Sequence, residues 1–458
     1  MSPPLRFTLV VLLVVLVTPG VLASAASAAV VTFAPAASFG TGVGPVSLAI
    51  GDLNGDGYLD LATANSAGTV SVLLGDGTGS FGPATDYGAG LDPTTIVVAD
   101  VNGDGHRDIA VTNRNIGGPG PGSVSVLLGT GTGMFGPAAS FGDPSGAWGI
   151  ARGDLNGDGH TDLATSSGTV SVLFGDGTGG FSPATTVSPF VGALMIAAGD
   201  LNGDGRPDLA TANFFNPTVS VLLNNGTGGF AAPVDFTVGT FPSSIAIGDL
   251  NSDRHADIVA GNGGSNSVSV LLGNGAGSFA PATNFATGQG PSSVAIGDLN
   301  VDGYPDLAVS NNGVFGGPGS ISVLLGDGAG GFAPSLSFAV GSVPTSVGIG
   351  DLNRDGRGDV VTADYFPRTV SVLLNTTNVT LADLLQFVGN EKLGPGKSLL
   401  AKLESALNAL QAGKTAAACG ILGAFINEVN AQTGKSLTPE QATELSAAAA
   451  RIRTALGC

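Results

Sequence analysis

One nine-residue pattern recurs along this chain and constrains its fold more than any other feature. In the first copy, Asp52, Asn54, Asp56 and Asp60 place oxygen-bearing side chains at positions 1, 3, 5 and 9, and Gly57 occupies position 6. Successive copies start 46 to 54 residues apart, which predicts one structural unit repeated seven times. The six further copies start at Asp100, Asp154, Asp200, Asp249, Asp298 and Asp351.

The pattern has the donor chemistry of a calcium-binding loop. Ca²⁺ prefers about six to eight oxygen ligands, and carboxylates and a carboxamide at alternate positions can wrap around such an ion. Gly at position 6 permits the positive φ of a sharp turn. We therefore predict Ca²⁺ as the cofactor, with the backbone carbonyl of position 7 also facing the ion. Besides the four residues of the first copy, the expected metal ligands are Asp100, Asn102, Asp104, Asp108, Asp154, Asn156, Asp158, Asp162, Asp200, Asn202, Asp204, Asp208, Asp249, Asn251, Asp253, Asp257, Asp298, Asn300, Asp302, Asp306, Asp351, Asn353, Asp355 and Asp359.

Two other interpretations of these loops compete with a calcium site. Asp, Asn and Gly also form ordinary turns without a metal. That interpretation is strongest for the fifth copy, where Arg254 replaces Gly at position 6. An EF-hand is excluded, because its loop closes with a bidentate Glu and residues 1–390 contain no Glu.

The charge of the chain agrees with metal loops and not with a nucleic-acid surface. The chain carries 16 basic and 35 acidic residues, a net charge of −19, and the seven loops hold 21 of the acidic residues. Most of the acidity is therefore expected ligand charge. The sequence contains no basic cluster of the kind that binds nucleic acid.

Short β-branched segments surround each loop and predict four strands in every unit. In the first unit they are residues 47–50, 60–64, 69–74 and 81–87, bounded by Gly, Asp and Asn turns. Four short strands in a unit of about 50 residues are typical of a propeller blade. We therefore expect an all-β seven-bladed β-propeller. The last unit stops after its third strand, and residues 30–39 match a fourth strand, so we expect the N-terminal strand to complete the last blade.

The order of motifs within a unit resembles a known repeat family. The sequence Phe279-Ala280-Pro281-Ala282 is followed by Pro-Ser-Ser-Val-Ala-Ile-Gly-Asp at residues 291–298, and then by the acidic loop. This order is similar to the FG-GAP (VCBS-type) repeats of integrin α-subunit propellers and many bacterial surface proteins, over about residues 30–375. The resemblance implies a seven-bladed propeller with Ca²⁺ between the first and second strands, and a role in cell adhesion.

The N-terminal residues have the composition of a secretory signal peptide. Arg6 precedes an apolar run over residues 7–17, and Ala26-Ser27-Ala28 forms a small-residue cleavage site. We expect residues 1–28 to be the signal peptide, residues 30–376 to be the propeller, and the protein to be secreted or at the cell surface. A membrane anchor is the alternative, although this apolar run is too short to span a bilayer.

Composition changes abruptly after the repeats and predicts a small all-α C-terminal domain over residues 380–458. All five Lys and all five Glu lie in this segment, and its apolar spacing becomes helical. We expect four helices, over about residues 380–389, 397–412, 415–433 and 439–456.

The only two cysteines of the chain, Cys419 and Cys458, lie in this helical segment. In an exported protein they predict one disulfide, with two free thiols as the alternative. The segment also resembles the bacterial C-terminal domain called FIMAH, through Ala418-Cys419, residues 424–427 and Leu456-Gly457-Cys458.

The sequence offers no group that indicates an enzyme. All three His occupy position 7 of a loop, and residues 1–379 contain no Lys or Glu that could serve as a tuned base. We therefore expect a binding or adhesion module for an extracellular protein or glycan. The alternatives are a carbohydrate-binding lectin propeller and a polysaccharide-cleaving enzyme. We expect a monomer that has no transmembrane segment after removal of the signal and does not bind nucleic acid.

The position of ligand binding follows from the direction of the strands. Successive strands alternate in direction, so the second-to-third and fourth-to-first connections lie on the face opposite the metal loops. Aromatic residues gather in these connections, and loops on a rigid scaffold often carry binding sites. The alternative is that these rings pack into the channel mouth. The expected ligand-binding residues are Trp148, Phe214, Phe215, Phe315, Tyr365 and Phe366.

Overall fold

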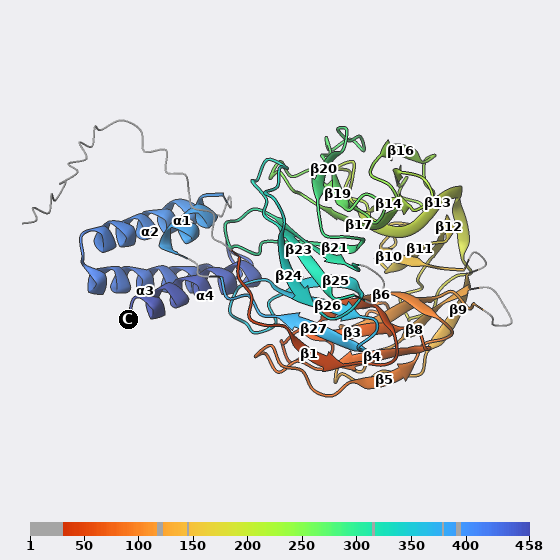
Figure 1. Ribbon diagram of the computed structural model, residues 1–458, viewed down its shortest axis with the longest axis horizontal. Helices are drawn as coiled ribbons and strands as arrows, with labels where there is room; N and C mark the ends of the chain where they lie inside the picture. The colour runs from red at the N-terminus through yellow and green to blue at the C-terminus, as the bar shows by residue number, and fades with distance from the viewer. Residues whose placement is uncertain (1–30, 117–121, 144–145, 314–316, 378–379, 391–394) are drawn as a thin grey trace, which may run out of the picture.

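The computed structural model describes residues 31–458, apart from 117–121, 144–145, 314–316, 378–379 and 391–394 (Figure 1). The described residues form a mostly β repeat region followed by a small helical C-terminal region. The expected signal peptide and Phe315 lie outside the described residues. None of the helices within the described ranges is both long and apolar enough to cross a membrane.

Antiparallel four-stranded units repeat along the chain, each with an acidic loop between its first two strands. In the first unit, β2 (Pro45–Gly51), β3 (Asp60–Asn65), β4 (Thr69–Leu73) and β5 (Thr85–Gly88) pair in sequence order. The other strands that follow are β6 (Pro93–Ala99), β7 (Asp108–Asn113), β8 (Gly122–Leu127), β9 (Ala139–Asp143), β10 (Gly149–Gly153), β11 (Asp162–Ser166), β12 (Gly168–Leu173), β13 (Thr185–Gly199), β14 (Asp208–Asn213), β15 (Thr218–Leu222), β16 (Val234–Thr237), β17 (Pro242–Gly248), β18 (Asp257–Asn262), β19 (Ser267–Leu271), β20 (Thr283–Ala286), β21 (Pro291–Gly297), β22 (Asp306–Asn311), β23 (Gly319–Leu324), β24 (Leu336–Val340), β25 (Pro344–Gly350), β26 (Asp359–Asp364) and β27 (Thr369–Leu373).

Two sheets depart from the simple four-strand order. The 15-residue strand β13 pairs with β12 and with β14, so β10 to β16 form one seven-stranded sheet. The N-terminal strand β1 (Ala37–Gly40) pairs with β27, which gives the order β1-β27-β26-β25. The N-terminal strand therefore completes the last sheet, as the sequence predicts.

The outermost strands are shorter than the sequence suggests. β1 starts at Ala37 and not at residue 30, and β5 starts at Thr85 and not at residue 81. A proline, Pro35 or Pro83, lies two residues before each observed start, and proline cannot donate a hydrogen bond to the ladder. Phe81 makes only an isolated bridge to Gly75.

Apolar side chains pack each sheet against the next one along the chain. Leu53 and Val70 of the first unit share a cluster with Ile109 of the second. Leu61 of the first unit packs with Val361 of the last, and β2 contacts both β6 and β25. Burial of these faces supplies the main driving force for the fold, and the arrangement is β-propeller-like.

The helical C-terminal region contains α1 (Leu381–Asn390), α2 (Gly396–Gln411), α3 (Thr415–Gln432) and α4 (Pro439–Ala455). These bounds lie within one residue of those expected from the sequence. The start of α4 is fixed by a capping box between Thr438 and Gln441, with Pro439 in the first turn. A disulfide joins Cys419 on α3 to Cys458 at the end of the chain.

Candidate metal loops and a candidate binding face

The first acidic loop is a tight turn built around the carboxylate at position 1. Asp52 Oδ1 accepts a hydrogen bond from the Gly55 amide at 2.7 Å, and its Oδ2 accepts one from the Gly57 amide at 2.9 Å. Asn54 Nδ2 donates to Asp56 Oδ2 at 2.9 Å. The side chains of positions 1, 3 and 5 therefore gather on the same turn.

This turn recurs in all seven loops, which are numbered here in chain order. The position-1 carboxylate accepts a hydrogen bond from the amide of position 6 in each loop. Loop five keeps the turn although Arg254 stands at position 6, with φ of 71°. The expected positive φ at this position is therefore present in a residue that favours it poorly.

Position 4 also adopts a positive φ, which the sequence analysis did not anticipate. It is Gly in the first four loops, whereas Ser252, Val301 and Arg354 have φ of 60°, 59° and 57° in the last three. The four glycines were the available signal. A β-branched residue such as Val301 is strained in this region of backbone space.

The aspartate at position 9 has a structural task in every loop. Asp60 is fully buried, and its two oxygens accept hydrogen bonds from the Leu53 and Gly75 amides, each at 2.8 Å. It thereby ties the acidic loop to the hairpin that follows the third strand. Equivalent bonds are made by Asp108, Asp162, Asp208, Asp257, Asp306 and Asp359.

The position-9 carboxylates carry perturbed pKa values because of where they lie. Burial raises the pKa of Asp162 and Asp257 to about 6 and that of Asp359 to about 7. Burial, followed by repulsion from Asp298, raises the pKa of Asp306 to about 8. Burial therefore disfavours the charged form of these four position-9 carboxylates.

The donor set of the loops fits Ca²⁺, because it consists only of oxygens from carboxylates, an amide and the backbone. The charges of Asp56 and Asp52 add to burial in raising the pKa of Asp60, so the three carboxylates of a loop repel one another. Within the described residues, no group of three or more His, Cys, Asp or Glu side chains lies close enough to hold a metal. The predicted ligands at positions 1, 3, 5 and 9 would hold the ion, whose charge would relieve the repulsion.

The opposite face carries a cavity that joins three of the expected aromatic residues. Trp148, Phe214 and Phe215 line a cavity of about 460 Å³, and 76% of the Phe215 surface is exposed. The guanidinium carbon of Arg114 lies 4.0 Å from the centroid of the Trp148 ring. Arg114 also forms an ion pair with Asp92 at 2.7 Å, so a charged pair lies beside the Trp148 ring.

The other expected aromatic residues lie elsewhere, and one residue was missed. Tyr365 and Phe366 pack edge to face, with ring centroids 5.4 Å apart. Phe241 was not among the predicted residues, and the centroid of its ring lies 5.3 Å from that of Phe214. Its signal was its place directly before Pro242 in a fourth-to-first connection.

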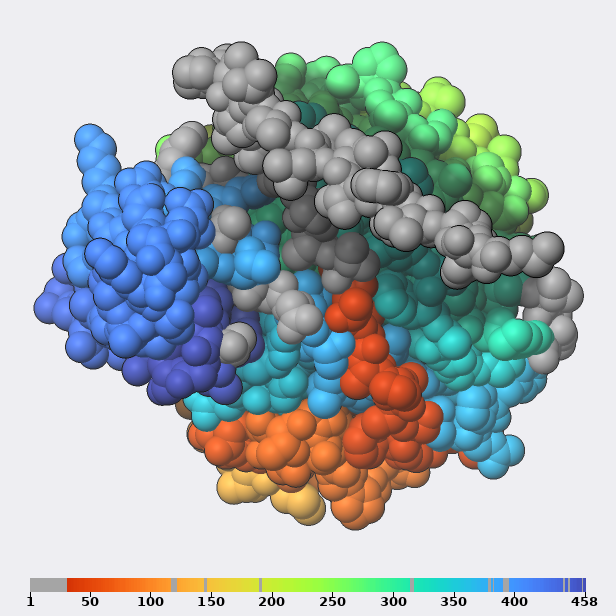
Figure 2. Space-filling model, turned by 60° about the vertical axis from the view of Figure 1, so that its left-hand side comes forward, coloured from red at the N-terminus to blue at the C-terminus, as the bar shows by residue number. Residues whose placement is uncertain are grey.

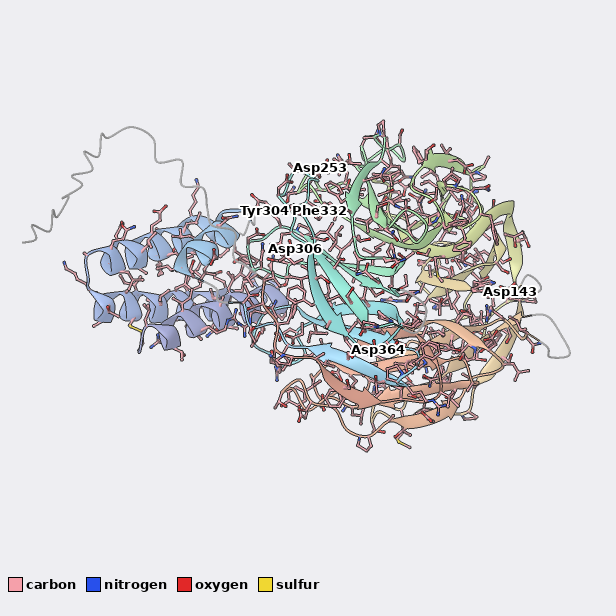
Figure 3. All side chains as sticks on the ribbon, in the orientation of Figure 1. Asp143, Asp253, Tyr304, Asp306, Phe332 and Asp364 are labelled. Carbon is pink, nitrogen blue, oxygen red and sulfur yellow. A yellow bond between two sulfur atoms is a disulfide. The ribbon has the colours of Figure 1, made fainter. Side chains whose placement is uncertain are left out.

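Exposed apolar side chains concentrate on this same face. Of eight exposed large hydrophobic residues within the described ranges, six lie in second-to-third or fourth-to-first connections. They are Val43, Leu91, Ile116, Phe215, Phe241 and Phe366. Figure 3 labels residues of both faces, with Asp253 and Tyr304 in the acidic loops and Asp143 and Asp364 at the opposite strand ends.

Comparison with known proteins identifies the repeats. The sequence profile described as FG-GAP-like repeat matches residues 52–111, 115–165, 163–211, 200–260 and 249–309, which together make up more than half of the chain. The chain therefore belongs to the FG-GAP-like repeat family. No curated protein matches it.

Several solved structures resemble the chain at low sequence identity. BBS1N, crystallised in complex with ARL6DN, is 11% identical with a TM-score of 0.51, over 75% of this chain and 96% of that one. A lectin of Agrocybe aegerita, described for its specific recognition of non-reducing terminal N-acetylglucosamine, is 24% identical with a TM-score of 0.48, over 72% and 85%. A protein of unknown function from Desulfotomaculum acetoxidans is 12% identical with a TM-score of 0.49, over 68% and 90%. The likeness to BBS1N concerns the fold alone.

Proposed function

We propose that this protein is an exported, calcium-stabilised seven-bladed β-propeller that binds an extracellular protein or glycan, without catalysis. Its binding surface is the face opposite the acidic loops, and its helical tail is a FIMAH-like domain. The concentration of exposed apolar side chains on that face is the observation that carries the proposal.

Three observations support a closed ring of seven blades. The chain contains seven acidic loops, and the long strand β13 serves as the last strand of one unit and the first strand of the next. The first strand β2 contacts its counterparts β6 and β25 on both sides.

The signal-like residues 1–28 support export.

An exposed apolar patch on a loop-bearing face is typical of an interaction site. Phe215, the most exposed of these apolar side chains, lines a cavity together with Trp148 and Phe214. Aromatic rings are enriched among residues that dominate binding energy, because they bury a large area at small entropic cost.

A lectin function is the second candidate, and the composition of the cavity favours it. The faces of Trp148 and Phe215 can pack on the C–H face of a sugar ring, while the Arg114–Asp92 pair offers polar partners for hydroxyl groups. A cavity of about 460 Å³ has the size of a small-ligand site.

The test is a binding screen on a glycan array and on a panel of purified extracellular matrix proteins, with and without Ca²⁺. Once a ligand is found, Trp148→Ala combined with Phe215→Ala should weaken binding at least tenfold and leave the calcium-dependent melt unchanged. The matched controls are Tyr58→Ala, His106→Ala and Tyr304→Ala, which alter position 7 on the loop face. If those three variants abolish binding and the aromatic double variant binds normally, the ligand binds on the loop face and the proposed binding face is wrong.

A further inference from the structure

The helical segment lies against two of the seven loops, and Figure 2 shows it in blue beside the last repeats. We propose that the helices α1 to α4, called the cap below, cover loop six (residues 298–306) and loop seven (residues 351–359). A divalent cation in loop six and the docked cap would then stabilise each other. This inference rests on the calcium binding proposed above.

Val301, at position 4 of loop six, anchors the cap. Its side chain is only 1% exposed and belongs to the apolar cluster of the helices, together with Leu381, Leu384 and Leu445. The other members of that cluster lie within residues 381–456. Because a β-branched residue at φ of 59° is strained, the apolar contacts with the helices offset a backbone conformation that Gly would adopt freely.

In loop seven, arginines compensate the charge at the contact with the cap. Asp355, at position 5, pairs with Arg357 of its own loop and lies 3.9 Å from Arg451 on α4. Arg357 Nη1 also donates to the Thr377 carbonyl at 2.7 Å, which ties the loop to the segment leading into the cap. Docking on loop seven therefore brings positive charge to a carboxylate.

In loop six, two of the carboxylates have no such arginine beside them within the described residues. Asp298 and Asp306 form no ion pair in the described part of the chain, and their carboxylates accept hydrogen bonds from backbone amides such as Gly303 and Leu299. The charge of Asp383 on α1 opposes that of Asp302. The cap thus places the Asp383 carboxylate near a loop that already holds three carboxylates.

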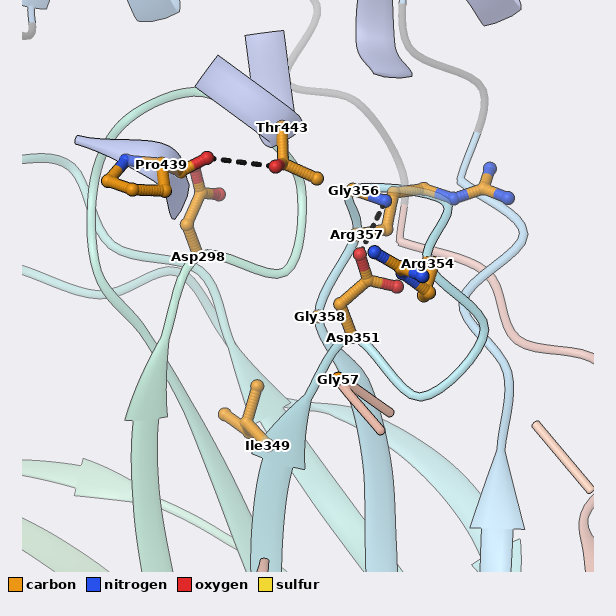
Figure 4. Close-up of a pocket in the computed structure, with 10 residues that line it drawn as sticks. All are labelled: Gly57, Asp298, Ile349, Asp351, Arg354, Gly356, Arg357, Gly358, Pro439 and Thr443. Carbon is orange, nitrogen blue, oxygen red and sulfur yellow. Dashed lines mark hydrogen bonds between the residues drawn. The ribbon is translucent and has the colours of Figure 1, made fainter. Parts of the chain in front are cut away.

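Burial makes this charge matter more in loop six than in the exposed loops. Position 5 is exposed in loops one to five but half-buried in loops six and seven, and Asn300 is 1% exposed. Asp298 and Asp351 also line a cavity of about 720 Å³ together with Pro439 and Thr443 of the cap (Figure 4). Asp298 and Asp306 have no ion-pair partner within the described residues, and a charge without a partner is unfavourable away from water. A cation in loop six would therefore favour docking. By thermodynamic linkage, docking would favour the cation equally.

The experiment is hydrogen–deuterium exchange on the full-length protein with Ca²⁺ and with EDTA, followed at α1, at α4 and at loop six. Ca²⁺ should slow exchange in α4 at least tenfold. Asp298→Asn in loop six should abolish that slowing, whereas Asp100→Asn, the same change in loop two, should preserve it. Small-angle X-ray scattering provides the second measurement, since release of the cap should enlarge the radius of gyration.

Val301→Gly tests the anchor separately. It should release the cap and enlarge the molecule even with Ca²⁺ present, while Ser252→Gly at the same position of loop five should leave the scattering unchanged. If the melt responds to Ca²⁺ but exchange in α4 does not, the coupling is refuted and calcium binding stands. If Asp298→Asn and Asp100→Asn affect α4 alike, the assignment to loop six fails. If Ca²⁺ changes neither the melt nor α4, both proposals fail.

Discussion

The two faces of the repeat region are built on the same strands, yet they vary to very different degrees. On the loop face, every unit keeps the same hydrogen bond from the amide of position 6 to the carboxylate of position 1. On the other face, the connection after β3 has three residues, whereas the connection after β22 has seven. Uniform geometry suits a stabilising task, and variable connections suit recognition.

The strongest test of this comparison is removal of metal. If the loop face stabilises the fold through Ca²⁺, excess EDTA should lower the melting temperature by about 10 °C or more, because each ion contributes about 2.7 kcal/mol at a hundredfold excess over Kd. Calorimetry of the full-length protein with added Ca²⁺ and with EDTA provides the measurement. Coincident melting curves would show that the loop face does not stabilise the fold through Ca²⁺.

The next test concerns a buried charge on the other face. Burial raises the pKa of Asp364 to about 6, where five other second strands end in Asn. Because the folded pKa lies above the ordinary value of 3.8, the contribution of Asp364 to stability is fully present below about pH 4 and is lost as pH rises through about 6. Asp364→Asn should therefore stabilise by about 3 kcal/mol at pH 7 and by little at pH 4.

Chemical denaturation of wild type and Asp364→Asn at both pH values measures this difference. Asn65→Asp, the reverse change at the equivalent position of β3, is the matched control and should destabilise at pH 7. A gain for Asp364→Asn that is equal at both pH values would show that burial of charge is not its cause.

A third test separates two aspartates within one loop. Asp108→Asn should destabilise the protein by about 2 kcal/mol even in EDTA, because the new amide group can accept only one of the two backbone hydrogen bonds. Asp104→Asn, at position 5, should change stability in EDTA much less, because its hydrogen bonds from Asn102 and His106 are exposed to water. It should mainly weaken the calcium-dependent melt. Equal effects of the two variants in EDTA would contradict the structural role of position 9.

The smallest expected effect is in loop five. Arg254→Gly should raise stability at limiting Ca²⁺ by about 1 kcal/mol, because glycine adopts the positive φ of position 6 without strain. Calcium titration calorimetry should also show one site strengthened in the variant. Full occupancy of this loop in the wild type at low Ca²⁺, with no gain on substitution, would show that Arg254 is tolerated there.

The sequence predicts the elements well because they depend on local patterns. Each acidic loop, each strand and each helix cap is recognised from residues that lie close together in the sequence. The pairing of β1 with β27 was also predicted, from the missing last strand. The place of Phe241 beside Phe214 and of Val301 in the helical core was not, because such contacts join segments far apart in sequence.

The pairing of β1 with β27 has a consequence for how the protein is made. These two strands are separated by more than 300 residues, so β1 has no strand to pair with until β27 has left the ribosome. At about 5–20 residues per second, synthesis of the intervening chain takes on the order of tens of seconds. During that time β27, the strand that pairs with β1, has not yet been made. Any truncated chain that ends before Thr369 lacks β27 and therefore the β1–β27 pairing. Its unpaired strand edges are open to association with other chains.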